Sequence, residues 1–498
     1  MSLSLPDIPT NIRTPGFYGS FSTGVPAYSS QQRMLLIGPK IAGGSAADGV
    51  AVRVSADPRA DFGNGSVLAE MATIARLNRP MLELWALPVP VVGTAATATI
   101  TVNAVPPAGT YAFWVFGRAR RCEITVAASG ETAATVAAKI AAAASKSFTF
   151  AGAGYSLEQP VTVAAADAVV TLTLRSAGTF TNGRTIVHTR AGDEVSPLGA
   201  YVTVAQTNGA GTPDVATALA GIAGGHFQTI ATAWDDDAVI AAIDAWLAEQ
   251  WLPINMKYGI AVLARTGTSG TLAAAGNAMN AKTRVFAGLR DTPTPTWVVA
   301  AGVAAILQDR FNLGMDISQA QIMARALAGI PVKGVEPSMT PGVEFTPAEV
   351  NNLYFDGVTP LKPEFDGTVT LGGRVITTYQ RSFVTGLEDT SWLDISDVMI
   401  PAYAMYFIRH YAANVHAATS LVSDERKKRE GQTRPKDYRE TCINAYARLC
   451  DEGICDDLDF YASNLIAEMA DDRKRINAQH PVRIAAPLLV MANDIRVR

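Results

Sequence analysis

Three stretches decide the fold of the first part of the chain: RMLLIGPK (33–40), FGNGSVLAEMATIARLN (62–78) and MLELWALPV (81–89). The first and third are short runs dominated by apolar residues, which is typical of buried strands. In the second, apolar residues recur at helical spacing, and Ser66 stands before them as a candidate N-cap. A strand, a helix and a strand in this order predict a parallel, right-handed unit, and so an α/β domain.

The α/β pattern is then interrupted and later resumes. Residues 92–210 contain short, alternating β-branched runs with one Ala-rich helix at 132–145, which predicts an inserted β-rich domain. After it, strands such as FQTIATAW and YGIAVLA again alternate with helical segments, and 351–380 is strand-like with Gly turns. We therefore expect a discontinuous α/β domain over 31–91 and 211–392.

The remaining part of the chain, 393–498, has a different surface chemistry. Residues 401–498 hold 15 Lys and Arg and 14 Asp and Glu, whereas residues 91–230 hold only 8 and 7. The pattern predicts a mixed α+β C-terminal domain that ends in a strand. Its helices are expected at 396–420, 435–452 and 456–470.

The terminal strand, HPVRIAAPLLVMANDIRVR (480–498), raises a structural question, because chain ends are usually polar and exposed apolar edges promote aggregation. Ile495 and Val497 alternate with arginines, which gives one face to bury and one to solvate. Pro487 suits an edge or a bulge. Either the segment is an inner strand of its own sheet, or it joins the sheet of another copy.

Residues 1–30 predict an extended arm, because four prolines disfavour a helix there. Phe17, Tyr18 and Phe21 give this arm apolar surface to bury. The opening MSLSLPDIPTNIR lacks the basic and apolar regions of a signal peptide, so we expect none. No apolar run reaches the roughly 18 residues of a membrane helix, so no membrane insertion is expected.

Motifs for catalysis or nucleotide binding are scarce. The chain has no P-loop and no nucleophile elbow. The glycines of GNGS (63–66) open a helix, which favours an ordinary helix start over an anion site. The acidic run Asp235–Asp237 opens another helix, and there N-capping is favoured over metal binding.

Metal and nucleic acid sites are not indicated either. His410 and His416 are six residues apart, which places them on different faces of one helix. The cysteines near the C-terminus lack zinc spacing, and buried thiols are favoured for Cys442, Cys450 and Cys455. A net charge of −4 gives no attraction to nucleic acid. Acidic residues flank the basic run RKKREGQTRPK, which favours a solvated surface or contact with an acidic protein partner. We expect no cofactor, no metal and no enzymatic activity.

Several blocks occur in a fixed order along almost the whole chain. They are IRTPGFYGSFSTG, FGNGSVLAEMATIARLNRPMLELWALPV, GAGTPDVATALAGI, YFDGVTPLKPEFDGTVTLGGRVITTYQ followed by SWLDI, and the closing apolar strand. This ordered set resembles the contractile tail sheath proteins of Mu-like bacteriophages. The inserted part, 92–210, is the least diagnostic.

The resemblance implies a non-enzymatic, multidomain structural subunit. Its α/β core carries an outward-facing β-rich inserted domain, and its mixed C-terminal domain lies near the tail tube and is completed by strand exchange between subunits. Subunits of this family stack as hexameric rings in a helical array and contract to drive the tube through the bacterial envelope for genome delivery. The implied partners are further copies of the chain, the tail tube protein, and baseplate and tail terminator proteins. The implied location is the phage tail of the virion, assembled in the host cytoplasm.

The resemblance also assigns roles to particular residues. Inter-subunit strand exchange is expected of both chain ends, through Ile12, Phe17, Tyr18, Phe21, Ile484, Leu488, Leu489, Val490, Ile495 and Val497. A tube-facing surface is expected at Arg409, Arg426, Lys427, Lys428 and Arg429.

Other functions stay open at this point. The sheath of a phage-tail-like bacteriocin or secretion machine would share the same pattern. From other classes, the alternatives are an α/β metal-dependent enzyme that uses Asp235–Asp237 and GNGS (63–66), and a surface adhesin with a carbohydrate-binding module at 92–210.

Overall fold

A computed structural model describes residues 32–191, 194–195, 197–340 and 342–496. Its largest sheet has eight strands in the order β17-β16-β15-β14-β13-β1-β3-β2. The six inner strands are parallel, and β2 and β17 are antiparallel edges. The strands are β1 (Arg33–Gly38), β2 (Val52–Arg53), β3 (Glu83–Pro88), β13 (Thr229–Thr232), β14 (Ile260–Thr266), β15 (Arg284–Leu289), β16 (Thr359–Pro363) and β17 (Val369–Leu371).

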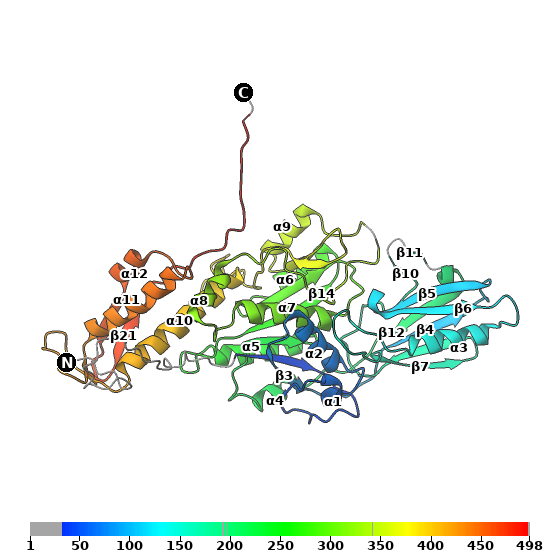
Figure 1. Ribbon diagram of the computed structural model, residues 1–498, viewed down its shortest axis with the longest axis horizontal. Coiled ribbons are helices and arrows are strands. Elements are labelled where there is room, and N and C mark those ends of the chain that lie inside the picture. The colour runs from blue at the N-terminus through cyan, green and yellow to red at the C-terminus, as the bar shows by residue number, and fades with distance from the viewer. Residues whose placement is uncertain (1–31, 192–193, 196, 341, 497–498) are drawn as a thin grey trace, which may run out of the picture.

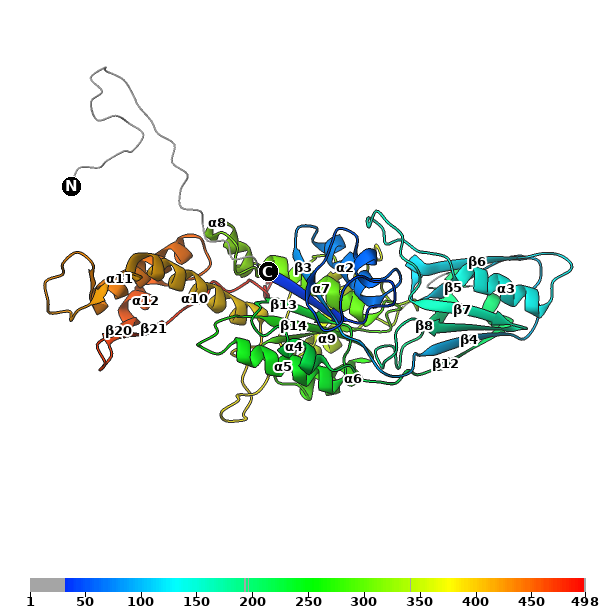
Figure 2. The ribbon, with the colours of Figure 1, turned by 90° about the horizontal axis from the view of Figure 1, so that it is seen from below.

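Helices cover both faces of this sheet, as parallel sheets require. α2 (Val67–Asn78) and α7 (Thr296–Arg310) lie on one face, and α4 (Val215–Ala220), α5 (Asp237–Gln250) and α6 (Ser269–Asn277) lie on the other (Figure 2). α7 is apolar on all sides and buried from Thr296 to Gln308. Ser66 caps α2, since its side chain accepts a hydrogen bond from the backbone N–H of Ala69. The short helices α1 (Pro58–Phe62), α8 (Ile317–Ala320) and α9 (Pro347–Phe355) complete this part.

Residues between β3 and α4 form two antiparallel sheets at one end of the elongated molecule (Figure 1). The four-stranded sheet has the order β12-β4-β8-β7, from β4 (Thr97–Val102), β7 (Val161–Ala166), β8 (Val169–Leu174) and β12 (Val202–Thr207). The three-stranded sheet has the order β6-β5-β9, from β5 (Gly109–Val115), β6 (Arg121–Val126) and β9 (Val187–His188). β10 (Arg190–Ala191) and β11 (Glu194–Val195) pair as a separate antiparallel sheet of two strands. The helix α3 (Ala133–Ala144) packs on both the four-stranded and the three-stranded sheet.

The C-terminal helices lie at the opposite end of the molecule (Figures 1 and 2). α10 (Ile395–His416) leads away from the large sheet and packs on α11 (Pro435–Asp451), which contacts α12 (Leu458–Asn464). A hairpin follows, formed by β20 (Ile466–Met469) and β21 (Ile476–Gln479). β18 (Ser420–Leu421) and β19 (Gln432–Thr433) frame the loop between α10 and α11.

The predicted mixed α/β class is confirmed, but two local predictions were wrong. The start of the strand-like region 351–380 belongs to α9, because Thr346 and Glu349 form a capping box and Pro347 occupies the first turn. The helix expected at 456–470 ends at Asn464, since the chain then turns into the hairpin. Residues 480–496 contain no regular strand, only one backbone bridge.

Candidate assembly surfaces

The C-terminal segment is first held against its own molecule. Ile484 forms a backbone bridge with Cys455, and the N–H of Ala485 donates to the carbonyl of Ile454 at 3.0 Å. Three residues later, Pro487 and Leu489 line a small cleft beside Leu327, while Leu488 points outward and is 70% exposed. This alternation is that of an extended strand. The point at which the segment leaves the body is therefore fixed after Leu489.

Beyond Leu489 the segment projects away from the body (Figure 1). Val490, Met491 and Ile495 are 78%, 76% and 86% exposed. Within the described part of the chain, the backbone of 490–496 makes no hydrogen bond to the rest of the molecule. An extended segment with bare apolar side chains and open N–H and C=O groups is a template for pairing with another chain.

The hairpin β20–β21 presents two open strand edges. Its two strands pair from Ile466↔Gln479 to Met469↔Ile476, and among the described residues neither outer edge has a partner strand. A lone two-stranded hairpin is marginally stable in water, whereas added strands stabilise it. The hairpin was not predicted from the sequence. Two signals for it were present: the strand-like residues after Leu465 and the turn-forming pair Asp471–Asp472.

Side chains of α11 and α12 hold the hairpin in place. The guanidinium of Arg439 donates to the Leu465 carbonyl at 2.9 Å, immediately before β20. The hydroxyl of Tyr461 lies 2.7 Å from Nδ1 of His480, immediately after β21, and the rings of Tyr446 and Tyr461 are stacked at 3.7 Å. Burial lowers the pKa of His480. The open edges are thus presented by a packed scaffold.

The basic residues predicted to face the tube come from two places, the helix α10 and the loop between β18 and β19. Arg426, Lys427 and Arg429 are exposed on the loop at the far end of the molecule (Figure 2). The ammonium of Lys428, on the same loop, is 3.5 Å from the carboxylate of Asp437. Arg409 lies on α10, near Tyr258. Burial raises the pKa of Tyr258, and the charge of Arg409 opposes that rise.

The two chain ends also include residues beyond the described part. Ile12, Phe17, Tyr18, Phe21 and Val497 all lie outside the described residues. Their assignment to strand exchange stays a prediction.

The acidic run that was weighed as a metal site connects the β-rich insertion to the large sheet. The carboxylate of Asp235 is 3.1 Å from Arg184 of the insertion and 3.1 Å from Arg265 of β14. Asp236 does occupy the N-cap position of α5, but its side chain makes no capping bond and instead accepts a hydrogen bond from Thr179. No group of three His, Cys, Asp or Glu residues in the described ranges is arranged to hold a metal ion.

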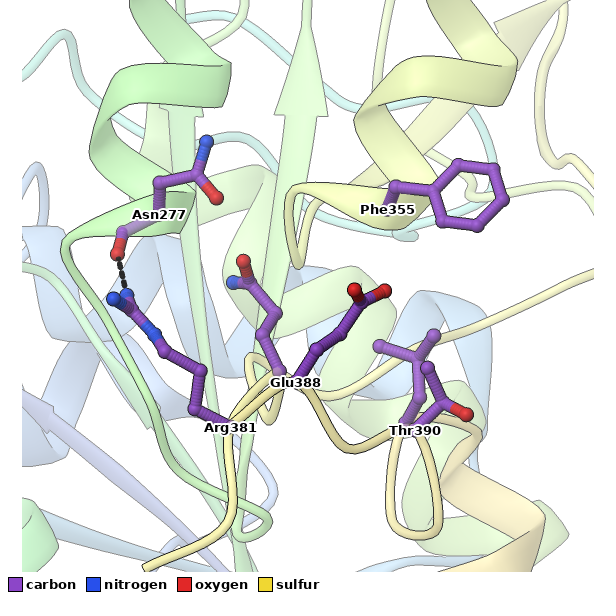
Figure 3. Close-up of a pocket in the computed structure, with 7 residues that line it drawn as sticks. Asn277, Phe355, Arg381, Glu388 and Thr390 are labelled. Atoms are coloured by element: carbon purple, nitrogen blue, oxygen red, sulfur yellow. Dashed lines mark hydrogen bonds between the residues drawn. The ribbon is translucent and has the colours of Figure 1, made fainter. Parts of the chain in front are cut away.

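A surface cavity of about 410 Å³ lies between α6, α9 and the loop 381–390 (Figure 3). The guanidinium of Arg381 donates to the carbonyl of Asn277, and Phe355 lies open to solvent at 62% exposure. Glu388 and Thr390 line the far side, without a nucleophile and base in hydrogen-bond contact. This cavity lacks a catalytic arrangement. The described helices also include none long and apolar enough to cross a membrane.

Comparison with known proteins identifies relatives over nearly the full length. No family model matches the chain. It is 27% identical over 486 residues to the Mu-like prophage FluMu tail sheath protein of Haemophilus influenzae, covering 94% of this chain and 93% of that protein. Solved structures of sheath tail proteins from Desulfitobacterium hafniense and Listeria innocua are each 12% identical, with a TM-score of 0.47. The first alignment covers 95% of this chain and 97% of that chain; the second covers 91% and 92%.

Proposed function

We propose that this chain, a homologue of the tail sheath protein of a Mu-like prophage, is the structural subunit of a contractile tail sheath. The homology is to a structural protein of a tail, in agreement with the prediction that the chain is not an enzyme. The observation that carries the proposal is the segment 490–496, which leaves the body with exposed apolar side chains and an unpaired backbone. A segment with these properties is suited to pairing with a strand edge of a neighbouring copy.

Strand exchange joins the copies in this proposal. The segment after Leu489 adds to an open edge of the hairpin β20–β21 of an adjacent copy, and main-chain hydrogen bonds supply the affinity. Met491 and Ile495 share one face of this extended segment and then lose their exposure, while Leu488 and Val490 lie on the other face. Ile484 and Leu489 contact their own molecule and fix the direction in which the segment departs. The N-terminal arm gives a second link, through the residues around Ile12.

Each copy both provides and accepts a strand, so the contact is heterologous. Such contacts do not close within a dimer and generate rings or helical filaments. Stacked hexameric rings in a helical array around the tail tube satisfy this rule. The tube protein, the baseplate and the tail terminator are the other partners; nucleic acid contact and membrane insertion are not part of the proposal. The assembled location is the virion tail, after assembly in the host cytoplasm.

Contraction would be driven by energy stored in the assembled lattice. Two packings of one rigid subunit that differ by a few kcal/mol are sufficient when many subunits change together. The extended array is then kinetically trapped until the baseplate releases it. Shortening of the array drives the tube through the bacterial envelope and allows genome delivery.

Electron microscopy of the purified full-length chain and of a chain truncated after Leu489 tests this function. The full-length chain is expected to form long striated tubes, and the truncated chain is expected to fold but remain unassembled, because 490–496 packs on nothing in the described molecule. Circular dichroism establishes folding independently of assembly. Tubes formed equally well by the truncated chain would contradict the proposal.

A matched pair of variants tests the apolar face of the segment. Ile495→Asn is expected to weaken assembly, whereas Asp494→Asn, at the neighbouring position on the opposite face, is expected to leave it intact. Equal assembly by the two variants would show that pairing does not bury Ile495.

The sheath of a phage-tail-like bacteriocin or secretion machine is compatible with the same subunit. Micrographs of particles from the producing cells separate the two cases. Tails attached to filled capsids indicate a phage, and free contractile tails indicate the other machines.

A further inference from the structure

A second apolar groove lies between α10 and the residues that follow α7. Its volume is about 380 Å³, and Leu313 and Met315 form one wall. Tyr403, Phe407 and Tyr411 of α10 form the other. The hydroxyl of Tyr403 donates to the carbonyl of Met315 at 3.0 Å, which joins the two walls.

The groove is apolar and aromatic inside, with charges only at its rim. The guanidinium of Arg448 lies 5.1 Å from the ring centre of Tyr411, and Asp316 is exposed on the opposite rim. The rings of Tyr406 and His410 pack edge to face at 4.3 Å along the same helix. Burial lowers the pKa of His410, which favours its neutral form. Such a groove matches an uncharged segment with several aromatic side chains.

The described chain begins beside this groove. The carbonyl of Arg33, at the start of β1, accepts a hydrogen bond from the N–H of Gln228 at 2.9 Å. The side-chain oxygen of Gln228 in turn accepts from the N–H of Leu313 at 3.0 Å. A single residue therefore connects the start of β1 to the groove wall.

The sequence before β1 contains a segment of the required chemistry. Residues 17–21 read Phe-Tyr-Gly-Ser-Phe and carry no charge. Phe21 is eleven residues before Gln32, and an extended chain of that length reaches up to roughly 36 Å. Because this segment is tethered next to the groove, its effective concentration exceeds that of any free partner.

We propose that the groove between α10 and the 313–317 loop binds the aromatic segment 17–21 of the same chain. The segment inserts its aromatic side chains between the two walls, and the residues before it are thereby directed away from the body. The C-terminal segment is anchored in a similar way, by Ile484 and Leu489, before it leaves the body of the molecule. Both connecting ends then leave the molecule from fixed points. The consequence for assembly rests on the proposed sheath function, whereas the anchor itself belongs to the single molecule.

Chemical cross-linking of the dilute, unassembled full-length chain tests the anchor. Cys122, Cys442 and Cys455 are buried, so a chain with Cys450→Ser has no accessible native thiol among its cysteines. Tyr18→Cys is then combined either with Asn414→Cys, which lies on the groove, or with Val415→Cys. Val415 is an exposed neighbour on the same helix that does not line the groove. A short bismaleimide links the pairs, and peptide mass spectrometry locates the links.

The expected result is an intrachain 18–414 link whose yield is independent of protein concentration and several-fold higher than that of 18–415. Phe407→Ala should lower the 18–414 yield, because it removes part of the aromatic wall. A link between two chains that grows with concentration would show that a second copy fills the groove and would overturn the proposal. Equal yields for the two pairs, or no 18–414 link, would also overturn it. The cross-linking measurement is made on the unassembled chain. Loss of the 18–414 link therefore tests the anchor, and loss of tubes in micrographs separately tests the sheath function.

Discussion

At the scale of single residues, one buried ion pair fixes the β-rich insertion to the large sheet. Glu70 of α2 and Arg120 of the insertion are each 3% exposed and form a salt bridge. The indole N–H of Trp297 donates to the second carboxylate oxygen of Glu70 at 3.0 Å. The guanidinium of Arg120 also lies 4.2 Å from the ring centre of Phe148. Charges this deeply buried are tolerated only as a pair.

Removing one partner of that pair should destabilise the fold strongly. Arg120→Met leaves the Glu70 carboxylate buried without its cation, and should lower the free energy of unfolding by about 3–5 kcal/mol. Adding Glu70→Gln removes the stranded charge but keeps an acceptor for Trp297, so the double variant should recover part of the loss. Urea unfolding followed by circular dichroism measures both values. A double variant no more stable than Arg120→Met would contradict this account of the pair.

The start of α11 should make stability depend on pH. The guanidinium of Arg434 holds the pKa of Asp437 well below its usual range, through hydrogen bonds to both carboxylate oxygens at 3.1 and 2.8 Å. A depressed pKa means that the folded state favours the carboxylate. Its contribution is therefore complete above the ordinary aspartate pKa, near 3.8, and is lost as the pH falls below that value.

Asp437→Asn should therefore lower the free energy of unfolding at pH 7 by about 1.5–3 kcal/mol. The gap to the parent protein should shrink as the pH falls from 5 towards 2. Urea titrations at several pH values measure this, with Asp471→Asn in the exposed hairpin turn as a control of equal charge change. A gap that stays constant into acid would show that Asp437 acts through packing instead of charge.

At the scale of elements, the basic loop between β18 and β19 offers exposed charge for a partner. Its basic residues Arg426, Lys427, Lys428 and Arg429 are all exposed, and the ammonium of Lys428 is 3.5 Å from the carboxylate of Asp437.

Charge reversal in the loop should separate tube binding from sheath polymerisation. The variant Arg426→Glu, Lys427→Glu, Arg429→Glu should still form tubes of sheath alone, because the loop belongs to neither the exchanged segment nor the hairpin β20–β21. If the loop faces an acidic tube surface, the reversed charges should repel that surface, and the variant should fail to coat purified tail tubes. Electron microscopy of mixtures with tail tubes measures the coating, and tubes formed by the variant alone show that its polymerisation is intact. Coating equal to that of the parent chain would remove the loop from the tube interface.

The elements that sequence could predict are those with strong local patterns. β1, α2 and β3 follow their apolar periodicity, and Ser66 caps α2 as expected. α9 was missed although TPAE carries a complete capping signal, because its apolar pattern is weak and glycine turns surround it. The departure point after Leu489 depends on pairing with residues around Cys455, and no local pattern reports such a contact.

At the scale of the whole molecule, the subunit is long, with the β-rich insertion at one end and the C-terminal helices at the other (Figure 1). The Glu70–Arg120 pair and the Asp235 contacts tie the insertion to the large sheet, while Tyr403 ties α10 to the loop at Met315. These contacts favour movement of the subunit as a rigid body. In the proposed sheath, the extended ends would keep neighbours connected while their packing changes. The role of the ends as connectors stays a prediction from sequence, whereas the hairpin β20–β21 was identified only in the folded chain.

A cryo-electron microscopy reconstruction of the tubes formed by the full-length chain tests the central claim most directly. The account predicts a continuous main-chain ribbon in which residues 490–498 of one copy pair with an edge of the hairpin β20–β21 of a neighbouring copy. A map in which those residues fold back onto their own molecule, with no strand shared between copies, would contradict it.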